Sequence, residues 1–379
     1  MKYWVGALLV AMTAGCDSSE SSHAAQPLAE AKPTRVTERV FLDADDPAIW
    51  IDQENPARSL VLGTYKGAGT ADRESRDGAL YVFDLSGVIV REKTIHGLRR
   101  PNNVDVEYGL KMQGGPVDIA VLTERFANRI RVYRLPDMEA MDGGGIPVFV
   151  GEQHREPMGI ALYRRPMDGT IFAIVSRKKG PRKRGYLWQY RLEDHGDGTV
   201  RGIKVRQFGQ WSGTKEIEAL VVDDTLGYVY ASDERLGVRK YHADPDRSEA
   251  DEELALFATE GFTEDREGLS IYEVTDTTGY IIVSDQGANA FHVFTREGSP
   301  ADPHRHERLK SVRLATLDSD GSDVTHESFG DQFPGGLFVA MSDDGTYHYY
   351  SWSAVAGDDL EVRKRVPGPK LATPRKENR

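Results

Sequence analysis

Five short segments of the chain are rich in carboxylate and amide oxygens, which are the ligand atoms that calcium prefers. They are Asp43-Ala-Asp-Asp46, Asn102-Asn-Val-Asp105, Lys215-Glu-Ile-Glu218, Glu264-Asp-Arg-Glu267 and Asp318-Ser-Asp-Gly-Ser-Asp323. Taken alone, each segment is more often a solvated turn than a metal site. If the fold brings several of them to one place, they supply enough oxygen ligands for calcium.

A second set of charged residues follows six apolar segments that we expect to be strands, at 60–64, 118–123, 171–176, 228–232, 280–284 and 337–342. The first three segments are followed by basic residues, and the last three by acidic or amide residues: Lys66, Arg125, Lys178 with Lys179, then Asp233 with Glu234, Asp285 with Gln286, and Asp343 with Asp344. A ring that is basic on one side and acidic on the other can hold metal ions against an anion. Charged hairpin loops without a function are the alternative.

The elements that must position these residues recur at a regular spacing. An aromatic residue stands in a short alternating segment at Phe83, Tyr133, Tyr190, Tyr241, Phe294 and Tyr350, at intervals of 50 to 57 residues. Each is preceded by one of the apolar segments. Six strand–loop–strand repeats of this length predict an all-β, six-bladed β-propeller, with the charged segments at its axial channel. A β-sandwich, the alternative, would not require regular spacing.

Composition narrows the classes of function. The chain has 379 residues, with 48 Lys and Arg against 60 Asp and Glu, a formal net charge of −12. This acidic balance argues against nucleic acid as a partner. The single cysteine excludes an intramolecular disulfide framework and a cysteine-based zinc cluster. We find no Ser-His-Asp elbow, Walker loop or dinucleotide-binding glycine turn, so metal-assisted attack by water is the expected mechanism.

The N-terminus is typical of an exported protein. Residues 1–15 contain an apolar run and end in Thr-Ala-Gly before Cys16, which predicts a signal peptide and a lipid-modified Cys16. A plain secretory signal with an incidental cysteine is the alternative. We expect residues 16–35 to be a flexible tether, residues 36–366 to form the propeller domain and residues 367–379 to be a disordered tail. The protein would then be secreted or anchored in the cell envelope, with no other contact to a membrane.

Several of these segments together resemble the β-propeller phytases, an alkaline, calcium-dependent family that dephosphorylates inositol hexakisphosphate. The resemblance runs from about residue 40 to 352. It is carried by Asp45-Asp-Pro-Ala-Ile-Trp50, Asn102-Asn-Val-Asp105, Glu218, Asp233-Glu234, Asp265-x-Glu267-Gly-Leu269, Gln286-Gly287, Asp320-Gly321 and Gly336-Leu-Phe-Val-Ala340. The first of these motifs is the most specific.

The resemblance implies a 3-phytase type of phosphomonoesterase and assigns roles residue by residue. Lys66, Arg125 and Lys178 or Lys179 would bind substrate phosphates, and Glu218 and Asp265 would be catalytic. Several calcium ions would be held by Asp46, Asp105, Glu218, Glu234, Asp265, Glu267, Gln286, Asp320 and Asp323. The expected substrate is phytate or its calcium complex, and the expected state is a monomer. Met158 departs from the family, which usually has Tyr at this position.

Two other functions fit the residues. A calcium-dependent propeller lactonase or sugar-ester hydrolase would keep a central cation, but it would not need three basic residues around it. A non-catalytic propeller that captures a phosphorylated ligand would keep Lys66 and Arg125 but could dispense with carboxylates that activate water. The presence of all the expected carboxylates favours the phosphomonoesterase.

Overall fold

The computed structural model of the chain describes residues 1, 30–41 and 43–364. The signal peptide after Met1, Cys16, most of the tether and the tail at 367–379 lie outside these residues, so those predictions stay predictions. Among the described residues, no helix is both long enough and apolar enough to cross a membrane.

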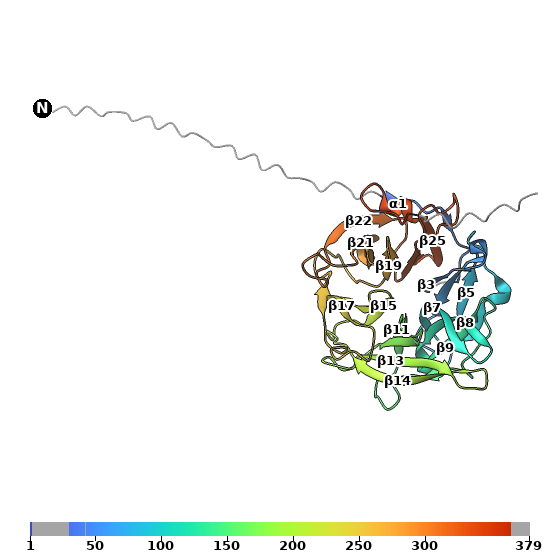
Figure 1. Ribbon diagram of the computed structural model, residues 1–379. Coiled ribbons are helices and arrows are strands. Elements are labelled where there is room, and N and C mark those ends of the chain that lie inside the picture. The colour runs from blue at the N-terminus through green and yellow to red at the C-terminus, as the bar shows by residue number, and fades with distance from the viewer. Residues whose placement is uncertain (2–29, 42, 365–379) are drawn as a thin grey trace, which may run out of the picture.

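Six β-sheets surround a common axis, and Figure 1 views them nearly along it. Blades 1 to 3 are each built from four consecutive strands. Blade 1 comprises β3 (Ala44–Trp50), β4 (Leu60–Tyr65), β5 (Gly78–Phe83) and β6 (Ile95–Leu98). Blade 2 comprises β7 (Pro101–Met112), β8 (Gly115–Glu124), β9 (Arg129–Leu135) and β10 (Ile146–Pro147). Blade 3 comprises β11 (Pro157–Arg164), β12 (Ile171–Arg177), β13 (Leu187–Asp194) and β14 (Val200–Phe208).

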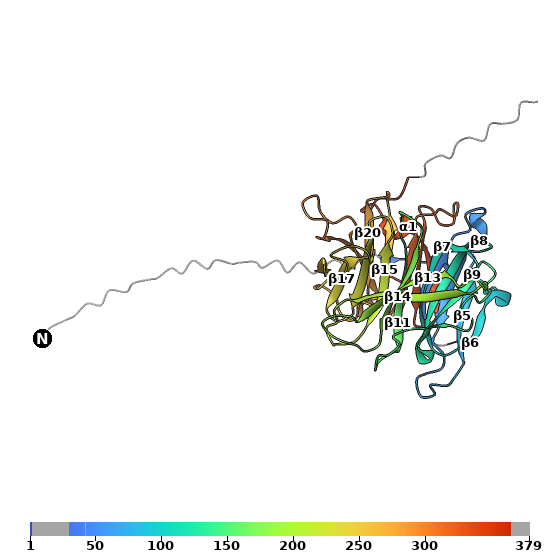
Figure 2. The same ribbon diagram turned by 60° about the horizontal axis from the view of Figure 1, so that its bottom comes forward.

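The remaining blades follow the same order, and Figure 2 shows the ring of sheets from a more oblique angle. Blade 4 comprises β15 (Ile217–Asp223), β16 (Tyr228–Asp233), β17 (Gly237–His242) and β18 (Ala255–Phe257). Blade 5 comprises β19 (Leu269–Glu273), β20 (Gly279–Asp285), β21 (Ala290–Thr295) and β22 (Arg308–Leu314). Blade 6 comprises β23 (Ser322–Thr325), β24 (Leu337–Ser342) and β25 (Thr346–Ser351), and the short helix α1 (Trp352–Ala356) follows it. The prediction of an all-β, six-bladed propeller is confirmed.

The N-terminal segment closes the ring. The strand β2 (Arg35–Val36) pairs with β25 and becomes the outermost strand of blade 6, and β1 (Glu30–Ala31) pairs with β22 at the edge of blade 5. Both short strands belong to the stretch predicted as a tether or to its border. Residues 30–31 and 35–36 thus cover edge strands whose backbone groups would otherwise be unpaired, and the tether before them stays a prediction.

The repeated residues occupy equivalent places in the blades. The six apolar segments form the second strand of each blade, and the six aromatic residues lie buried in the third strand. The first strands, β3, β7, β11, β15, β19 and β23, contact one another around the axis. The segments at the starts of these first strands therefore converge from all six blades.

Candidate active site

In each blade a residue at or just before the start of the first strand belongs to one ring around the axis. In blades 1 to 4 the pairing with the second strand is interrupted at this point by a bulge, so that Asp45, Asn102, Met158 and Glu218 leave the regular ladder. Glu267 and Asp320 precede β19 and β23 at the corresponding place. We call these six residues the inner ring. Five of them carry a side-chain oxygen.

A second set of equivalent residues follows the second strands, and a recurring backbone hydrogen bond defines it. The amide nitrogens of these residues donate to the segment just before the inner ring over 2.9 to 3.2 Å: Lys66 to Asp43, Arg125 to Arg100, Lys178 to Glu156, Glu234 to Glu216 and Gln286 to Asp265. We call Lys66, Arg125, Lys178, Glu234 and Gln286 the outer ring. Lys178, rather than Lys179, is thus the residue equivalent to Lys66 and Arg125.

Carboxylates of the rings hold Lys66 tightly. Its Nζ lies 2.9 Å from Asp45 Oδ1, 3.1 Å from Asp320 Oδ2 and 3.7 Å from Asp43 Oδ1, and its side chain is only 11% exposed. Burial alone would lower the pKa of Lys66, but the charges of Asp45 and Asp320 overcome this effect and raise the pKa well above its usual value. The ammonium group therefore stays charged between two blades.

The other cations near the axis are paired in the same way. Lys178 contacts Glu216, and Arg125 Nε lies 3.1 Å from Glu156 Oε2. Asp265 forms ion pairs with Lys215, at 2.9 Å, and with Arg235. Lys66, Arg125 and Lys178 thus each contact a carboxylate. An anionic substrate must compete with these carboxylates unless another positive charge neutralises them.

The acidic half of the site fits a cation. Ligand oxygens of Glu216, Glu218 and Glu234 lie within 4.8 Å of one another, and so do those of Glu234, Asp265 and Glu267. Both carboxylate oxygens of buried Glu234 are without a hydrogen-bond partner in the described structure. Burial, and then the charge of Glu218, raises the pKa of Glu234 to about 9. An ionised carboxylate in this environment requires a positive partner, which a divalent cation would supply.

Glu267, Gln286 and Asp320 extend this cluster into blades 5 and 6. Gln286 Nε2 donates to Glu267 Oε2 at 2.9 Å and to Asp320 Oδ1 at 2.6 Å. Burial, and then the neighbouring charge of Asp320, raises the pKa of Glu267 to about 11. Six of the nine predicted metal ligands are therefore together: Glu218, Glu234, Asp265, Glu267, Gln286 and Asp320.

The other three predicted ligands, Asp46, Asp105 and Asp323, hold neighbouring blades together. Asp46 Oδ2 accepts the backbone N–H of Val104, Asp105 Oδ2 that of Leu162, and Asp323 Oδ2 that of Ile49. Each bond joins the first strand of one blade to the first strand of the next. In blade 1 the inner-ring position belongs to Asp45, which the ligand prediction omitted, and not to Asp46.

Asp105 and Asp323 line a separate cavity of about 260 Å³ farther along the first strands, together with Glu107 and Asp224. Burial raises the pKa of Asp105 to about 8 and that of Asp323 to about 6. This second acidic group shares no residue with the cluster around Glu234.

Hydroxyl groups at the ends of the second strands support the inner ring, and none of them belongs to the site residues predicted from the sequence. Thr123 Oγ1 accepts from Asn103 N and donates to the Met158 carbonyl at 2.6 Å. Ser176 Oγ accepts from Gly159 N at 2.8 Å and donates to the Ile217 carbonyl. The signal was a Ser or Thr two residues before each charged or amide residue that follows a second strand, at Thr64, Thr123, Ser176, Ser232, Ser284 and Ser342.

A basic cavity of about 540 Å³ adjoins the outer ring at blades 2 and 3. Its lining contains Arg125, Lys178 and Lys179, three of the residues proposed from the sequence to bind phosphate, and also Arg73, His154 and Arg155, with Glu156 as the carboxylate. Arg73 comes from the loop between β4 and β5, and its guanidinium lies 2.8 Å from Glu156 Oε1 and 4.3 Å from the centre of the Phe126 ring. Glu156 therefore joins Arg73 to Arg125 across this cavity.

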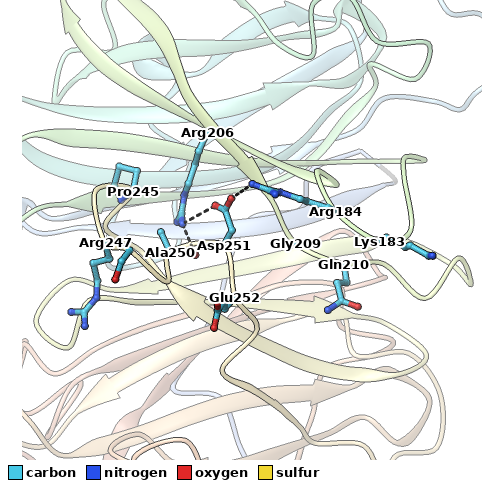
Figure 3. A pocket seen from close by; sticks show the side chains of 11 residues that line it. Lys183, Arg184, Arg206, Gly209, Gln210, Pro245, Arg247, Ala250, Asp251 and Glu252 are labelled. Carbon is cyan, nitrogen blue, oxygen red and sulfur yellow. Dashed lines mark hydrogen bonds and ion pairs between the residues drawn. The ribbon is translucent and has the colours of Figure 1, made fainter.

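The basic residues of the loop at 177–184 lie in different surroundings. Arg177 is buried, donates to the carbonyl oxygens of His154 and Gly185, and lies over the Phe149 ring. Lys183 and Arg184 line a different cavity of about 480 Å³ beside β14. Figure 3 shows Arg184 and Arg206 turned toward Asp251 in this cavity. Only Lys178 and Lys179 of the loop reach the basic cavity of the outer ring.

The fold and the site together define a β-propeller enzyme with a hydrolytic type of centre, in which oxygen ligands for cations adjoin side chains that bind an anion. The chain matches the sequence profile described as Phytase over residues 4–355. It is also 30% identical over 351 residues to the 3-phytase of Bacillus subtilis (strain 168), covering 86% of this chain and 85% of that protein. The chain belongs to the phytase family.

Two solved propellers are similar in outline. The Dos1 propeller aligns with a TM-score of 0.42 at 10% identity, over 82% of this chain and 68% of that one. The WD40 β-propeller domain of Doa1 aligns with a TM-score of 0.46 at 9% identity, over 85% of this chain and 97% of that one. These similarities are too low to add to the argument.

Proposed function

We propose that this phytase is a calcium-dependent phosphomonoesterase that hydrolyses phytate, or its calcium complex, to lower inositol phosphates and phosphate. One observation carries the calcium dependence: Glu234 is buried with no hydrogen-bond partner in the described structure, inside a cluster of carboxylates whose pKa values are raised. Membership of the phytase family supports the substrate. It also favours this function over a lactonase or a ligand-binding propeller.

The proposed calcium ligands are the residues that converge: Asp45, Glu218, Glu234, Asp265, Glu267, Gln286 and Asp320. Several ions are required, because the cluster extends from blade 4 to blade 6 and contains more carboxylates than one ion can neutralise. When bound, calcium would supply positive charge and acidify a water molecule for attack on phosphorus. Asp46, Asp105 and Asp323 are proposed to join blades and not to bind these ions.

The phosphate would lie between the acidic cluster and the basic outer ring. Lys66 and Arg125 would bind its equatorial oxygens, where charge must be stabilised as the bond to the inositol oxygen breaks. Lys178 and Lys179 would bind the same or an adjacent phosphate in the basic cavity. Neutralisation of Asp45, Asp320 and Glu216 by calcium would release Lys66 and Lys178 from their present partners.

Glu218 and Asp265 are the proposed catalytic carboxylates. Glu218 belongs to the inner ring, and its oxygen lies within 4.8 Å of ligand oxygens of Glu216 and Glu234. It would orient the attacking water and accept its proton. Asp265 is held by Lys215 and Arg235, and its ligand oxygen lies within 4.8 Å of those of Glu234 and Glu267.

Export is part of the proposal. The apolar N-terminal run before Cys16 supports a signal peptide and lipid modification, so that a monomeric propeller would be tethered to the cell envelope or secreted. Phytate is thus the proposed partner, with neither nucleic acid nor a second protein subunit. Labelling with a radioactive fatty acid should modify the wild-type chain but not the Cys16→Ser variant, and equal labelling of both would refute the anchor.

The function is tested by phosphate release from phytate, measured with the purified protein in excess calcium and again after chelation. We expect release that requires calcium. Glu218→Gln should nearly abolish turnover while leaving the midpoint of thermal unfolding in saturating calcium almost unchanged. Phosphate release that persists after chelation would refute calcium dependence, and an active Glu218→Gln variant would refute the role given to Glu218.

A further inference from the structure

Asn102 is the neutral hydrogen-bond donor of the inner ring. Its side chain is buried, and Nδ2 lies 3.0 Å from Glu218 Oε1 and 3.4 Å from Asp45 Oδ2. The three residues belong to blades 2, 4 and 1. Since a primary amide has two N–H hydrogens, it can give one to each carboxylate.

The orientation of this amide follows from its partners. Both neighbouring atoms are carboxylate oxygens that only accept hydrogen bonds, so the nitrogen must face them. The amide oxygen, Oδ1, is consequently turned away, and it is buried without a hydrogen-bond partner among the described residues. A buried carbonyl oxygen without a partner is costly, which indicates that this position serves the nitrogen.

The contact with Glu218 crosses a blade. Blade 3 lies between Asn102 and Glu218, and its inner-ring residue is Met158, which has no hydrogen to donate. In the part of the chain that the structure describes, Asn102 supplies the one side-chain hydrogen bond that the Glu218 carboxylate receives. Oε2 of Glu218 accepts none there and remains free for the carboxylate cluster.

We propose that Asn102 is the positioning residue for Glu218, an inference that rests on the proposed function. By donating to Oε1, Asn102 fixes the rotation of the carboxylate, so that the other oxygen is directed toward a water at the metal site. Because the amide is neutral, it orients Glu218 without adding negative charge next to Asp45. An aspartate of the same size would lose both donors and repel both neighbours.

The experiment compares wild-type protein with Asn102→Ala, the isosteric Asn102→Asp and the control Asn103→Ala. Asn103 is the adjacent buried amide, and its side chain has no hydrogen bond to Asp45 or Glu218 in the described structure. For each full-length protein, kcat and KM for phytate in saturating calcium are measured. Terbium(III) luminescence gives the affinity for a cation independently of activity, and thermal unfolding in calcium checks the fold.

We expect Asn102→Ala to lower kcat about 10- to 100-fold, as is usual when a supporting hydrogen bond to a metal-site group is lost, with KM little changed. Asn102→Asp should lower kcat at least as much, although its extra carboxylate tightens terbium binding. Asn103→Ala should keep the wild-type kcat. A lower kcat together with tighter terbium binding in Asn102→Asp would indicate a positioning role. If Asn102 were a metal ligand, kcat and terbium affinity would rise or fall together.

Wild-type kcat in Asn102→Ala would overturn the inference, because this variant cannot donate either hydrogen bond. A parallel loss of terbium affinity and kcat in Asn102→Ala would overturn it too, in favour of a ligand role. A lowered unfolding temperature with unchanged kinetic constants would mean a structural role only. If the wild-type protein releases no phosphate from phytate in calcium, the proposed function fails first, and the inference fails with it.

Discussion

Gly159 lies directly against the backbone of Glu218: a Cβ atom on residue 159 would stand 1.7 Å from the Glu218 carbonyl oxygen. The contact joins blade 3 to blade 4 just where Glu218 enters the inner ring. A side chain at residue 159 would have to displace backbone, which a packed interface resists. The glycine therefore sets how closely these two blades approach each other and where Glu218 is placed.

Gly159→Ala is expected to lower both the unfolding temperature and kcat, because the new methyl group must displace the Glu218 backbone. Ser176→Ala is the matched comparison. It removes the hydroxyl that bonds Gly159 N and the Ile217 carbonyl but adds no bulk, so we expect a smaller kinetic effect. Kinetics on phytate and thermal unfolding measure both variants. A Gly159→Ala variant with wild-type kcat would show that Glu218 is placed by other contacts.

Lys66→Met should weaken the ion-free protein more than the calcium-loaded protein. Without the ammonium group, Asp45 and Asp320 lose the cation that now lies 2.9 and 3.1 Å away, and their repulsion across two blades is no longer offset. Added calcium should restore the unfolding temperature by a larger increment than in the wild type, while KM for phytate rises. Calorimetry with chelator and with calcium measures this, and equal increments in the two proteins would contradict it.

Lys178→Met is expected to raise KM for phytate about tenfold or more, as befits loss of a charge-assisted contact to phosphate. Lys183→Met is the control, because Lys183 belongs to the same basic loop but lines the other cavity. It should leave KM at the wild-type value. Equal effects of the two substitutions would indicate general attraction by the charge of the loop rather than binding by Lys178.

The stability of the ion-free protein should fall as the pH rises. The pKa of Glu234 is about 9 in the folded chain against the ordinary value of 4.5, so between these pH values the folded state holds a proton that the unfolded state has released. Raising the pH across this window therefore favours unfolding. Glu267, with its pKa raised to about 11, acts in the same direction.

Calcium should reduce or abolish this loss, because it stabilises the ionised carboxylates and displaces their protons. Unfolding temperatures measured in chelator and in calcium at several pH values between about 5 and 9 test the prediction. Release of protons when calcium is added near neutral pH would also indicate that calcium binds these carboxylates. Parallel pH curves with and without calcium would contradict the placement of calcium beside Glu234.

Asp105→Ala distinguishes a joint between blades from a metal ligand. Its carboxylate accepts the Leu162 N–H, and removal leaves this buried donor unpaired, at a cost of about 1–3 kcal/mol of unfolding free energy. We expect that loss in denaturant unfolding, with the number of bound terbium ions and kcat unchanged. A decrease in the number of bound ions would instead make Asp105 a ligand.

Much of this arrangement was predictable from the sequence, because a propeller repeats the same local chemistry in each blade. Apolar second strands, buried aromatic residues in the third strands and an interval of 50 to 57 residues are properties of each repeat, independent of the others. Equivalent positions then follow by counting, so Lys66, Arg125 and Glu234 could be placed near one axis before any contact was known.

The finer assignments depended on tertiary structure. The bulge at the start of β3 decides between Asp45 and Asp46, since a shift of one residue turns a side chain from the axis to the neighbouring blade. The bond from Lys178 N to the Glu156 carbonyl likewise decides between Lys178 and Lys179.

Closure of the ring and the placement of Asn102 were beyond local patterns altogether. The strand β2 completes a blade whose other strands lie at the opposite end of the chain, and Asn102 meets Glu218 across 116 residues. Neither contact produces a periodic pattern in the sequence, because each occurs only once. The sequence by itself therefore determined the repeated frame and the types of charge around the axis. Only the packing of six blades against one another decided which carboxylates face a cation, which ones join blades, and which neutral side chain holds Glu218.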